Sequence, residues 1–167
     1  MTITFFVPGT PRPAGSKRAF AIKKGGAYTG RVVVMDACTK TKSWQRVVRE
    51  AAQAAYSGPL WQGAVKLSLT FILTRPGGHW RTGKNAALLK ADAPAFPITR
   101  IPGDLTKLTR CFEDALTGVI WVDDSQVVEK HESKTFTGKK GDAFGVQATI
   151  EALEPDLEIR LLLTERA

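Results

Sequence analysis

Three aspartates stand around one apolar segment of the chain. Asp123 and Asp124 are neighbours in the run GVIWVDDSQVV at residues 118–128, and Asp104 stands at the start of a helical pattern that ends near Gly118. About 14 helical residues span roughly 20 Å, so the aspartates do not meet across the length of that helix. They meet if they come from opposite protomers, or if the segment after Gly118 doubles back along the helix as a strand.

The chemistry that such aspartates favour is the binding of Mg²⁺. This hard cation prefers carboxylate oxygens, keeps several waters and takes the phosphate oxygens of a substrate as its remaining ligands. Zinc is poorly supported, because the sequence has only two histidines, His79 and His131. We therefore expect Mg²⁺ as the cofactor, with Mn²⁺ as an alternative.

The exposed face of the expected helix carries further polar groups. Thr106, Arg110 and Asp114 follow one another at i, i+4 and i+8, and Lys107 is adjacent. From this face Arg110 could contact a scissile phosphate. The alternative interpretation is an Arg110–Asp114 surface pair beside an aspartate N-cap and a solvated Asp-Asp turn. Spacing alone leaves both interpretations open.

Positive charge is concentrated in the first half of the chain, although the whole sequence carries a formal net charge of +8. Residues 1–83 hold thirteen Lys and Arg against two acids, whereas residues 84–167 have a net charge of −3. A basic half suits a polyanionic partner, because neutralised phosphates release condensed counterions. A basic RNA-binding module is not supported, since the aromatic-rich signature of a sequence-reading RNA domain is missing.

The composition is typical of one globular, intracellular domain. No stretch approaches the roughly 20 apolar residues that span a bilayer, and the N-terminus lacks the pattern of a signal peptide. Cys38 and Cys111 have no metal-ligand or redox spacing, which is typical of a reducing cytosol. We expect a cytoplasmic protein with no membrane partner.

Hydrophobic periodicity predicts the elements that position these residues. Strands are expected over residues 2–7, 31–36, 65–73, 126–136 and 144–153, the last two as a hairpin. One helix is expected from Ser43, as its N-cap, to the SGP sequence at 57–59, and a second between Asp104 and Gly118. The basic, Gly/Pro-rich stretches at 10–30 and 75–103 are expected to be loops, the second too long for an idle connector.

Several blocks of the sequence resemble the RusA family of Holliday junction resolvases. The specific part is GDLTKLTRCFEDALTG followed by VIWVDDSQVV, which is similar to the family pattern Asp-x-Asp-Asn/Lys-Leu-x-Lys/Arg, then Asp-Ala-Leu-Thr, then Asp-Asp-x-Gln-Val-Val. FFVPGTPRPAGSKRAF, RPGGHWRTGKN and APAFPITR also resemble family members in the same order. The resemblance runs over most of residues 3–150.

This resemblance implies a single small α+β domain, with a mixed β-sheet packed against two main helices, that forms a homodimer. It implies a RusA-like endonuclease domain over residues 1–153, followed by a C-terminal tail over 154–167. The implied activity is Mg²⁺-dependent resolution of four-way DNA junctions by paired nicks, in recombination and repair. The implied origin is a phage or prophage, with the protein working in the cytoplasm of a bacterial host.

The resemblance also assigns roles to residues. Asp104 and Asp124 take the positions of metal-ligand aspartates, with Asp123 as a neighbouring ligand, and Arg110 stands where the family has its catalytic Lys or Arg. Asp114, in the Asp-Ala-Leu motif, and Glu113 are expected to support the site. The residues expected to bind DNA phosphates are Lys17, Arg18, Arg75, Arg81, Lys84, Arg100, Lys107 and Lys134.

One position departs from the family pattern. The second aspartate of Asp-x-Asp is Thr106 here, so a neutral hydroxyl replaces a charged ligand. A threonine can orient a water or bind Mg²⁺ weakly, but a missing carboxylate lowers the affinity of the site for metal. The alternative function is therefore a RusA-like protein that binds branched DNA with weak cleavage or none.

Overall fold

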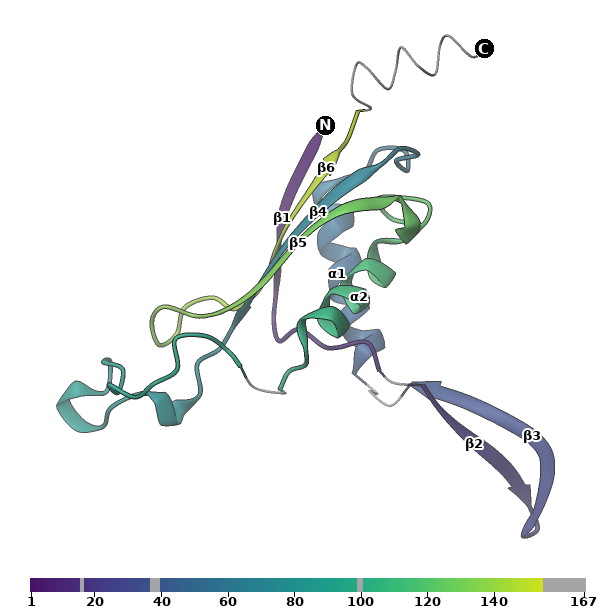
Figure 1. Ribbon diagram of the computed structural model, residues 1–167, viewed down its shortest axis with the longest axis horizontal. Helices are drawn as coiled ribbons and strands as arrows, with labels where there is room; N and C mark the ends of the chain where they lie inside the picture. The colour runs from purple at the N-terminus through teal and green to yellow at the C-terminus, as the bar shows by residue number, and fades with distance from the viewer. Residues whose placement is uncertain (16, 37–39, 99–100, 155–167) are drawn as a thin grey trace.

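The computed structural model of the chain describes residues 1–15, 17–36, 40–98 and 101–154. Its main sheet has the strand order β1-β6-β4-β5 and contains β1 (Thr2–Pro8), β4 (Val65–Leu73), β5 (Val127–Phe136) and β6 (Gly145–Ala152). β4 and β5 run parallel, while the β1–β6 and β4–β6 pairs are antiparallel. The expected α+β fold with a mixed sheet is therefore confirmed (Figure 1).

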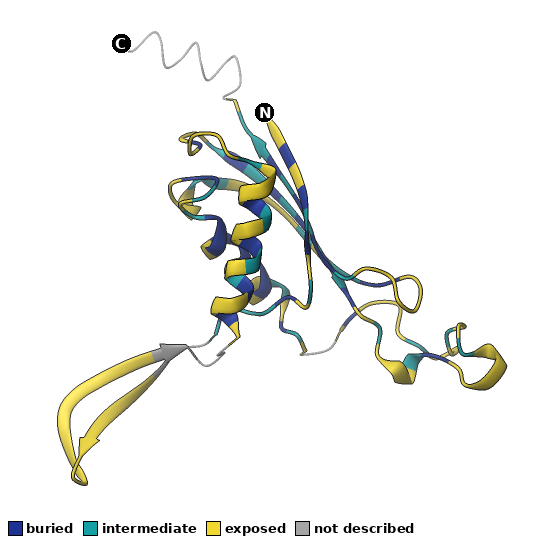
Figure 2. Cartoon of the chain, turned by 180° about the vertical axis from the view of Figure 1, so that it is seen from behind, coloured by how far each residue is buried: buried dark blue, intermediate teal, exposed yellow. Residues whose placement is uncertain are grey.

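Two helices of the described residues, α1 (Thr41–Ala55) and α2 (Leu105–Leu116), cover one face of this sheet (Figure 1). The burial pattern of β4 shows where the core lies. Its residues alternate between buried and half-buried, so one face of the strand points to the helices. Phe112 of α2 is fully buried and stacks on Phe5 of β1, with ring centroids 6.3 Å apart. The buried residues in Figure 2 lie between the helices and the sheet.

The predicted hairpin over 126–136 and 144–153 is wrong. β5 and β6 do form, but β4 lies between them and pairs with both. The connection after Phe136 therefore passes the end of β4 instead of making a tight turn. The apolar face of β4 is buried along its whole length, and this burial is consistent with the central position of β4 in the sheet.

The predicted start of the first helix is also wrong. Ser43 lies inside the first turn of α1, where its hydroxyl donates to the carbonyl of Lys40, and Lys40 occupies the N-cap without a side-chain cap. The helix begins at Thr41, which is buried and donates its hydroxyl to the carbonyl of Pro13 at 3.1 Å. A tertiary contact, which the local pattern does not contain, sets the start of the helix.

Segment 9–15 leads from β1 toward β2 (Lys17–Lys24) and passes the starts of both helices. It contacts α1 through Thr41 and Pro13, and it contacts α2 through the amide of Ala14, which donates to the carbonyl of Lys107 at 2.8 Å. Gly9 at its start has a φ of 113°, a conformation that favours glycine, and its amide donates to Phe144. The segment therefore fixes the two helix starts relative to each other.

Two projections extend from the side where both helices begin (Figure 1). The stretch at 10–30, predicted as a loop, instead contributes to a hairpin of β2 (Lys17–Lys24) and β3 (Ala27–Asp36), which turns at Gly25 and Gly26 with φ values of 59° and 87°. The other projection is the 75–103 loop, whose described residues include the short helices η1 (Gly77–His79) and η2 (Gly83–Asn85). Most of both projections is exposed (Figure 2).

The boundary proposed at 153/154 falls just after β6 ends at Ala152, and residues 155–167 of the predicted tail lie outside the described residues. The division into domain and tail stays a prediction. In the described part of the chain, no helix is long and apolar enough to cross a membrane.

Candidate functional site

Asp104 begins α2, as the sequence predicts. One oxygen of its carboxylate accepts the backbone amide of Lys107 at 2.8 Å, and the other lies 3.2 Å from the Lys107 ammonium. The backbone hydrogen bond, followed by the side chain of Lys107, holds the pKa of Asp104 below its usual value. The carboxylate is exposed and ionised, so it can face an incoming ligand.

The chain reverses direction after α2 and places the second acidic group. Gly118 has a φ of 74°, and Asp123 caps η3 (Asp124–Gln126) by accepting the amide of Ser125 at 2.9 Å. The side chain and backbone amide of Ser125 lower the pKa of Asp123. Gln126 anchors the turn, because its amide group accepts from Val122 and Asp123 and donates to the carbonyls of Trp61 and Gly63.

The two acidic groups lie at opposite ends of α2. Asp124 is exposed and close enough to Glu113, in the C-terminal half of the helix, for its charge to raise the pKa of Glu113. Asp104 lies nine residues before Glu113, about 14 Å along the helix axis. The segment after Gly118 does double back, but β5 begins beside the end of α2 and brings Glu113, not Asp104, close to Asp124.

Carboxylates are the donors that a hard divalent cation prefers, so the side chains fit such an ion by chemistry. Asp104 and the Asp123–Asp124 pair lie at opposite ends of α2, however. The described residues hold no group of three or more His, Cys, Asp or Glu arranged to bind a metal. The assignment of Asp104, Asp123 and Asp124 as metal ligands therefore stays a prediction.

Between these ends, α2 and β5 share a polar cluster that the sequence analysis recognised only in part. Glu113 is 7% exposed and pairs with Lys130 of β5, with the Glu113 Oε1 and Lys130 Nζ atoms 2.5 Å apart. The hydroxyl of Thr109 donates to Glu132, also on β5. The sequence analysis did not identify Lys130 and Glu132 as part of this cluster. Their spacing of two residues on a strand could have shown that they share one face, and in the structure this is the face toward α2.

Burial raises the pKa of Glu113, against the lowering effect of Lys130. A carboxyl group with a raised folded-state pKa stabilises the fold less as pH rises above its ordinary value of 4.5, because the unfolded chain then ionises more readily. We expect Glu113→Gln to gain stability relative to the wild type as pH rises from 4 to about 7. Urea unfolding across this range measures the difference. A stability difference between the two proteins that does not change over this pH range would contradict the raised pKa of Glu113.

The exposed face of α2 carries Thr106, Arg110 and Asp114, all of which are exposed as expected. The contact of Arg110 with a phosphate and the Arg110–Asp114 surface pair both stay predictions. Lys107 and Lys134 line a pocket of about 700 Å³ at the start of the helix together with Asp104.

The basic residues expected to bind DNA divide between the surface and the interior. Arg81 and Lys84 are exposed in the 75–103 loop, and Lys134 is half-buried, with its ammonium 3.4 Å from the carbonyl of Gly103. Arg75 is half-buried, donates to the carbonyl of Pro94 at 2.8 Å and lies over the Phe136 ring, which are structural contacts. Lys17 belongs to β2, as does Arg18, but their side chains are not described, and Arg100 lies outside the described residues.

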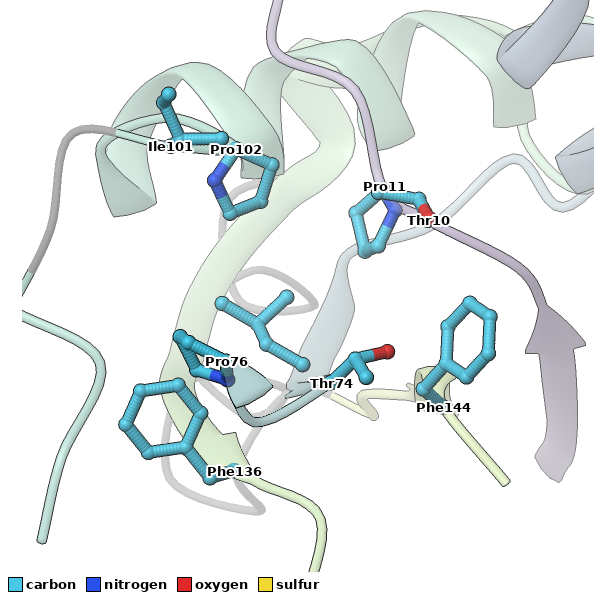
Figure 3. A pocket seen from close by; sticks show the side chains of 9 residues that line it. Thr10, Pro11, Thr74, Pro76, Ile101, Pro102, Phe136 and Phe144 are labelled. Atoms are coloured by element: carbon cyan, nitrogen blue, oxygen red, sulfur yellow. The ribbon is translucent and has the colours of Figure 1, made fainter. Parts of the chain in front are cut away.

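A largely apolar pocket of about 490 Å³ lies where the 75–103 loop meets the domain. Figure 3 shows Phe136 and Phe144 on one side of it, with Pro102 and Pro11 opposite. Thr10 and Pro11 belong to segment 9–15, so this segment separates the apolar pocket from the start of α1.

Comparison with protein families gives one finding that covers most of the chain. The model described as endodeoxyribonuclease RusA matches residues 8–147. The match includes α2, both acidic groups and both projections. No curated protein matches the sequence.

Proposed function

Because the chain belongs to the RusA family of endodeoxyribonucleases, whose members bind branched DNA and cut Holliday junctions, we propose that it is a divalent-metal-dependent endonuclease that resolves four-way junctions by paired nicks. We also propose that the protein works in the cytoplasm of a bacterial host and that its origin is a phage or prophage, which fits a small resolvase of this family.

One observation supports the proposal above the others. The exposed face of α2, with Arg110 and Thr106, begins at Asp104 on the side from which both basic projections extend (Figure 1). DNA held between the hairpin and the 75–103 loop would meet the start of α2. Phosphate binding by the basic side chains of these projections then brings the DNA backbone to Asp104 and the exposed face of α2.

In this proposal, the chain's own residues bind and orient the scissile phosphate. Arg110 offsets negative charge that develops on the phosphate in the transition state, and Lys107 and Lys134 hold the flanking backbone. Asp104, Asp124 and Asp123 are the proposed metal ligands, with Mg²⁺ as the proposed ion and Mn²⁺ as the alternative. A bound ion of this kind lowers the pKa of a coordinated water and stabilises the leaving oxygen.

We also propose that the enzyme works as a homodimer. A four-way junction presents two symmetry-related scissile sites, and one chain of this size supplies chemistry for only one of them. The separation of Asp104 and Asp124, at opposite ends of α2, supports this assembly, because a partner chain can bring the missing carboxylate to each half of the site.

A second function, binding of branched DNA with weak cleavage or none, is favoured by one residue. Thr106 is exposed on α2 and offers a neutral hydroxyl where the family pattern has a carboxylate. Glu113 does not replace that carboxylate without cost, because it is buried and already paired with Lys130.

The experiment that separates these functions compares the wild type with Thr106→Asp on a labelled four-way junction, with and without Mg²⁺. We expect slow, Mg²⁺-dependent nicking by the wild type and nicking at least about tenfold faster by Thr106→Asp, because a restored carboxylate raises the metal affinity. The substitution lies in the first turn of α2, where a negative charge interacts favourably with the helix dipole, so the fold is retained.

Junction binding in EDTA is the control and should be the same for both proteins. If neither protein nicks while both bind junctions tightly, the binding function is correct. If neither binds junctions better than duplex DNA, the junction assignment is wrong. A wild type that nicks as fast as Thr106→Asp would exclude residue 106 from the metal site.

A further inference from the structure

The exposed apolar side chains of the protein gather on its two projections. In the described part of the chain, 14 large hydrophobic side chains are exposed, of which six lie on the β2–β3 hairpin and four on the 75–103 loop. Single exposed apolar side chains are ordinary on a protein surface, whereas a cluster of them is typical of a site that binds another molecule. None of the functions assigned above uses these side chains.

Part of the hairpin is apolar on both faces. Phe20 lies opposite Val33, while Val32 and Val34 lie opposite two alanines of β2. Directly opposite residues share a face and successive residues alternate between faces, so Phe20 and Val33 are on one face and the other two valines are on the other. These four side chains are between 40% and 61% exposed. We call residues 19–22 and 32–34 the hairpin root.

The domain of the same chain does not cover this root. β2 and β3 contact each other, and in the described part of the chain neither makes an extensive contact with the main sheet or with α1 and α2. Figure 1 shows the hairpin extending away from them. A two-stranded hairpin alone is only marginally stable in water, so a molecule that covers the root would stabilise it.

The root fits a protein surface better than it fits DNA. Its seven residues carry no charge and include a run of three valines. A DNA backbone binds Lys and Arg instead, and unpaired bases stack on aromatic side chains. Lys23, Lys24 and Arg31 lie beyond the root, towards the tip of the hairpin. The tip is therefore suited to DNA and the root to another protein.

We propose that the hairpin root packs on the 75–103 loop of a second copy of this chain, over the apolar pocket at the base of that loop. Ile101 lines this pocket of about 490 Å³ and is itself 82% exposed (Figure 3). Ile98, on the same loop, is 85% exposed. The inference rests on the homodimer proposed above for its choice of partner, and it does not depend on nuclease activity.

Two-fold symmetry allows this contact. The hairpin and the 75–103 loop extend to opposite sides of the domain in Figure 1, and Figure 2 shows the same chain after a half-turn about the vertical axis. The half-turn brings the hairpin to the side that the loop occupies in Figure 1. A two-fold axis in this direction therefore places each hairpin beside the loop of the other chain, and the contact forms twice.

The area available agrees with a stable dimer. A half-exposed aromatic side chain has about 100 Å² left to bury and a half-exposed Val or Ile about 50 Å², so Phe20, Ile22 and the three valines would bury roughly 300 Å² per hairpin. Each contact covers a similar area of the partner's loop and forms twice, which gives about 1,200 Å² in total, the lower limit for a specific, stable interface.

The first test makes the same substitution at two equally exposed valines. Val32 is 61% exposed in the root, and Val128 is 63% exposed on β5, outside both projections. We expect Val32→Asp to raise the dimer dissociation constant at least about a hundredfold, because the contact, made twice, buries a carboxylate without a partner. Val128→Asp should leave it within about threefold. Sedimentation velocity at micromolar protein, without DNA or metal, measures the dimer, and urea unfolding checks the fold.

A mixture of two weakened variants tests the loop as the partner surface. Ile101→Lys should also weaken the dimer, because it puts an ammonium at the apolar pocket. In a mixed dimer with Val32→Asp, one contact is that of the wild type and the other brings together two introduced charges of opposite sign. We expect the mixture to form dimers at concentrations at which each variant alone is monomeric.

The outcomes separate this inference from the proposed nuclease. A monomeric wild type overturns it, and weaker junction binding by Val32→Asp would then assign the root to DNA. Equal weakening by Val32→Asp and Val128→Asp, an unweakened Ile101→Lys dimer, or a mixture that stays monomeric also overturns it, even if the wild type nicks junctions. The expected pattern of dimers, together with no nicking by the wild type, supports the interface and contradicts the nuclease.

Discussion

Asp124→Asn is expected to slow junction nicking by at least about a hundredfold, while the affinity for the junction in EDTA stays within about twofold of the wild type. The reason is that the substitution removes a proposed metal-ligand charge without changing the shape of an exposed side chain. Single-turnover nicking at saturating protein measures the rate, and a filter or anisotropy assay measures binding.

The matched control is Asp142→Asn. Asp142 is also exposed and its carboxylate accepts a backbone amide, that of Lys139, but it lies in the connection between β5 and β6. We expect its nicking rate to stay within about twofold of the wild type. Nicking by Asp124→Asn at the control rate would remove Asp124 from the metal site and favour a site built around Asp104.

Phe112→Ala is expected to have the largest effect on stability, lowering the free energy of unfolding by about 3–5 kcal/mol. The ring is fully buried in α2 and stacks on Phe5, so its loss leaves a cavity between the helix and the sheet. Small domains have only about 5–15 kcal/mol of stability, so the variant should approach the limit of folding. Urea unfolding followed by tryptophan fluorescence gives the value.

The control uses the same substitution at an exposed site. Phe96 in the 75–103 loop is 68% exposed, and Phe96→Ala should change the free energy of unfolding by less than about 0.5 kcal/mol. A cost below about 1 kcal/mol for Phe112→Ala would mean that α2 is not packed on the sheet as described. The surface of α2 that carries Arg110 would then need a different placement.

Local patterns were enough to predict several elements. The alternation of Val65, Leu67 and Leu69 predicted β4 with its bounds, and the helical pattern after Asp104 predicted Asp104 as the N-cap of α2. Each of these patterns lies within a few neighbouring residues, so the local sequence contains it. The order of strands is a different kind of information. Nothing in residues 126–153 shows that β4, more than fifty residues earlier, lies between β5 and β6.

The candidate site follows the same division. Each acidic group could be identified from the residues next to it in the sequence. The pairing of Glu113 with Lys130 and of Thr109 with Glu132, by contrast, depends on the packing of β5 against α2. The 10–30 stretch shows a further limit. Its glycines and charges are typical of a loop, whereas pairing of β2 with β3 converts it into a hairpin whose residues remain exposed.

Segment 9–15 gives the hairpin a mechanical role. It leads directly into β2, and on the way it is bonded to the first residue of α1 and to the first turn of α2. In the proposed function, a force that a DNA arm exerts on the hairpin would act on both helix starts through these two hydrogen bonds. In that function, segment 9–15 would couple the direction of a bound DNA arm mechanically to the residues around Asp104.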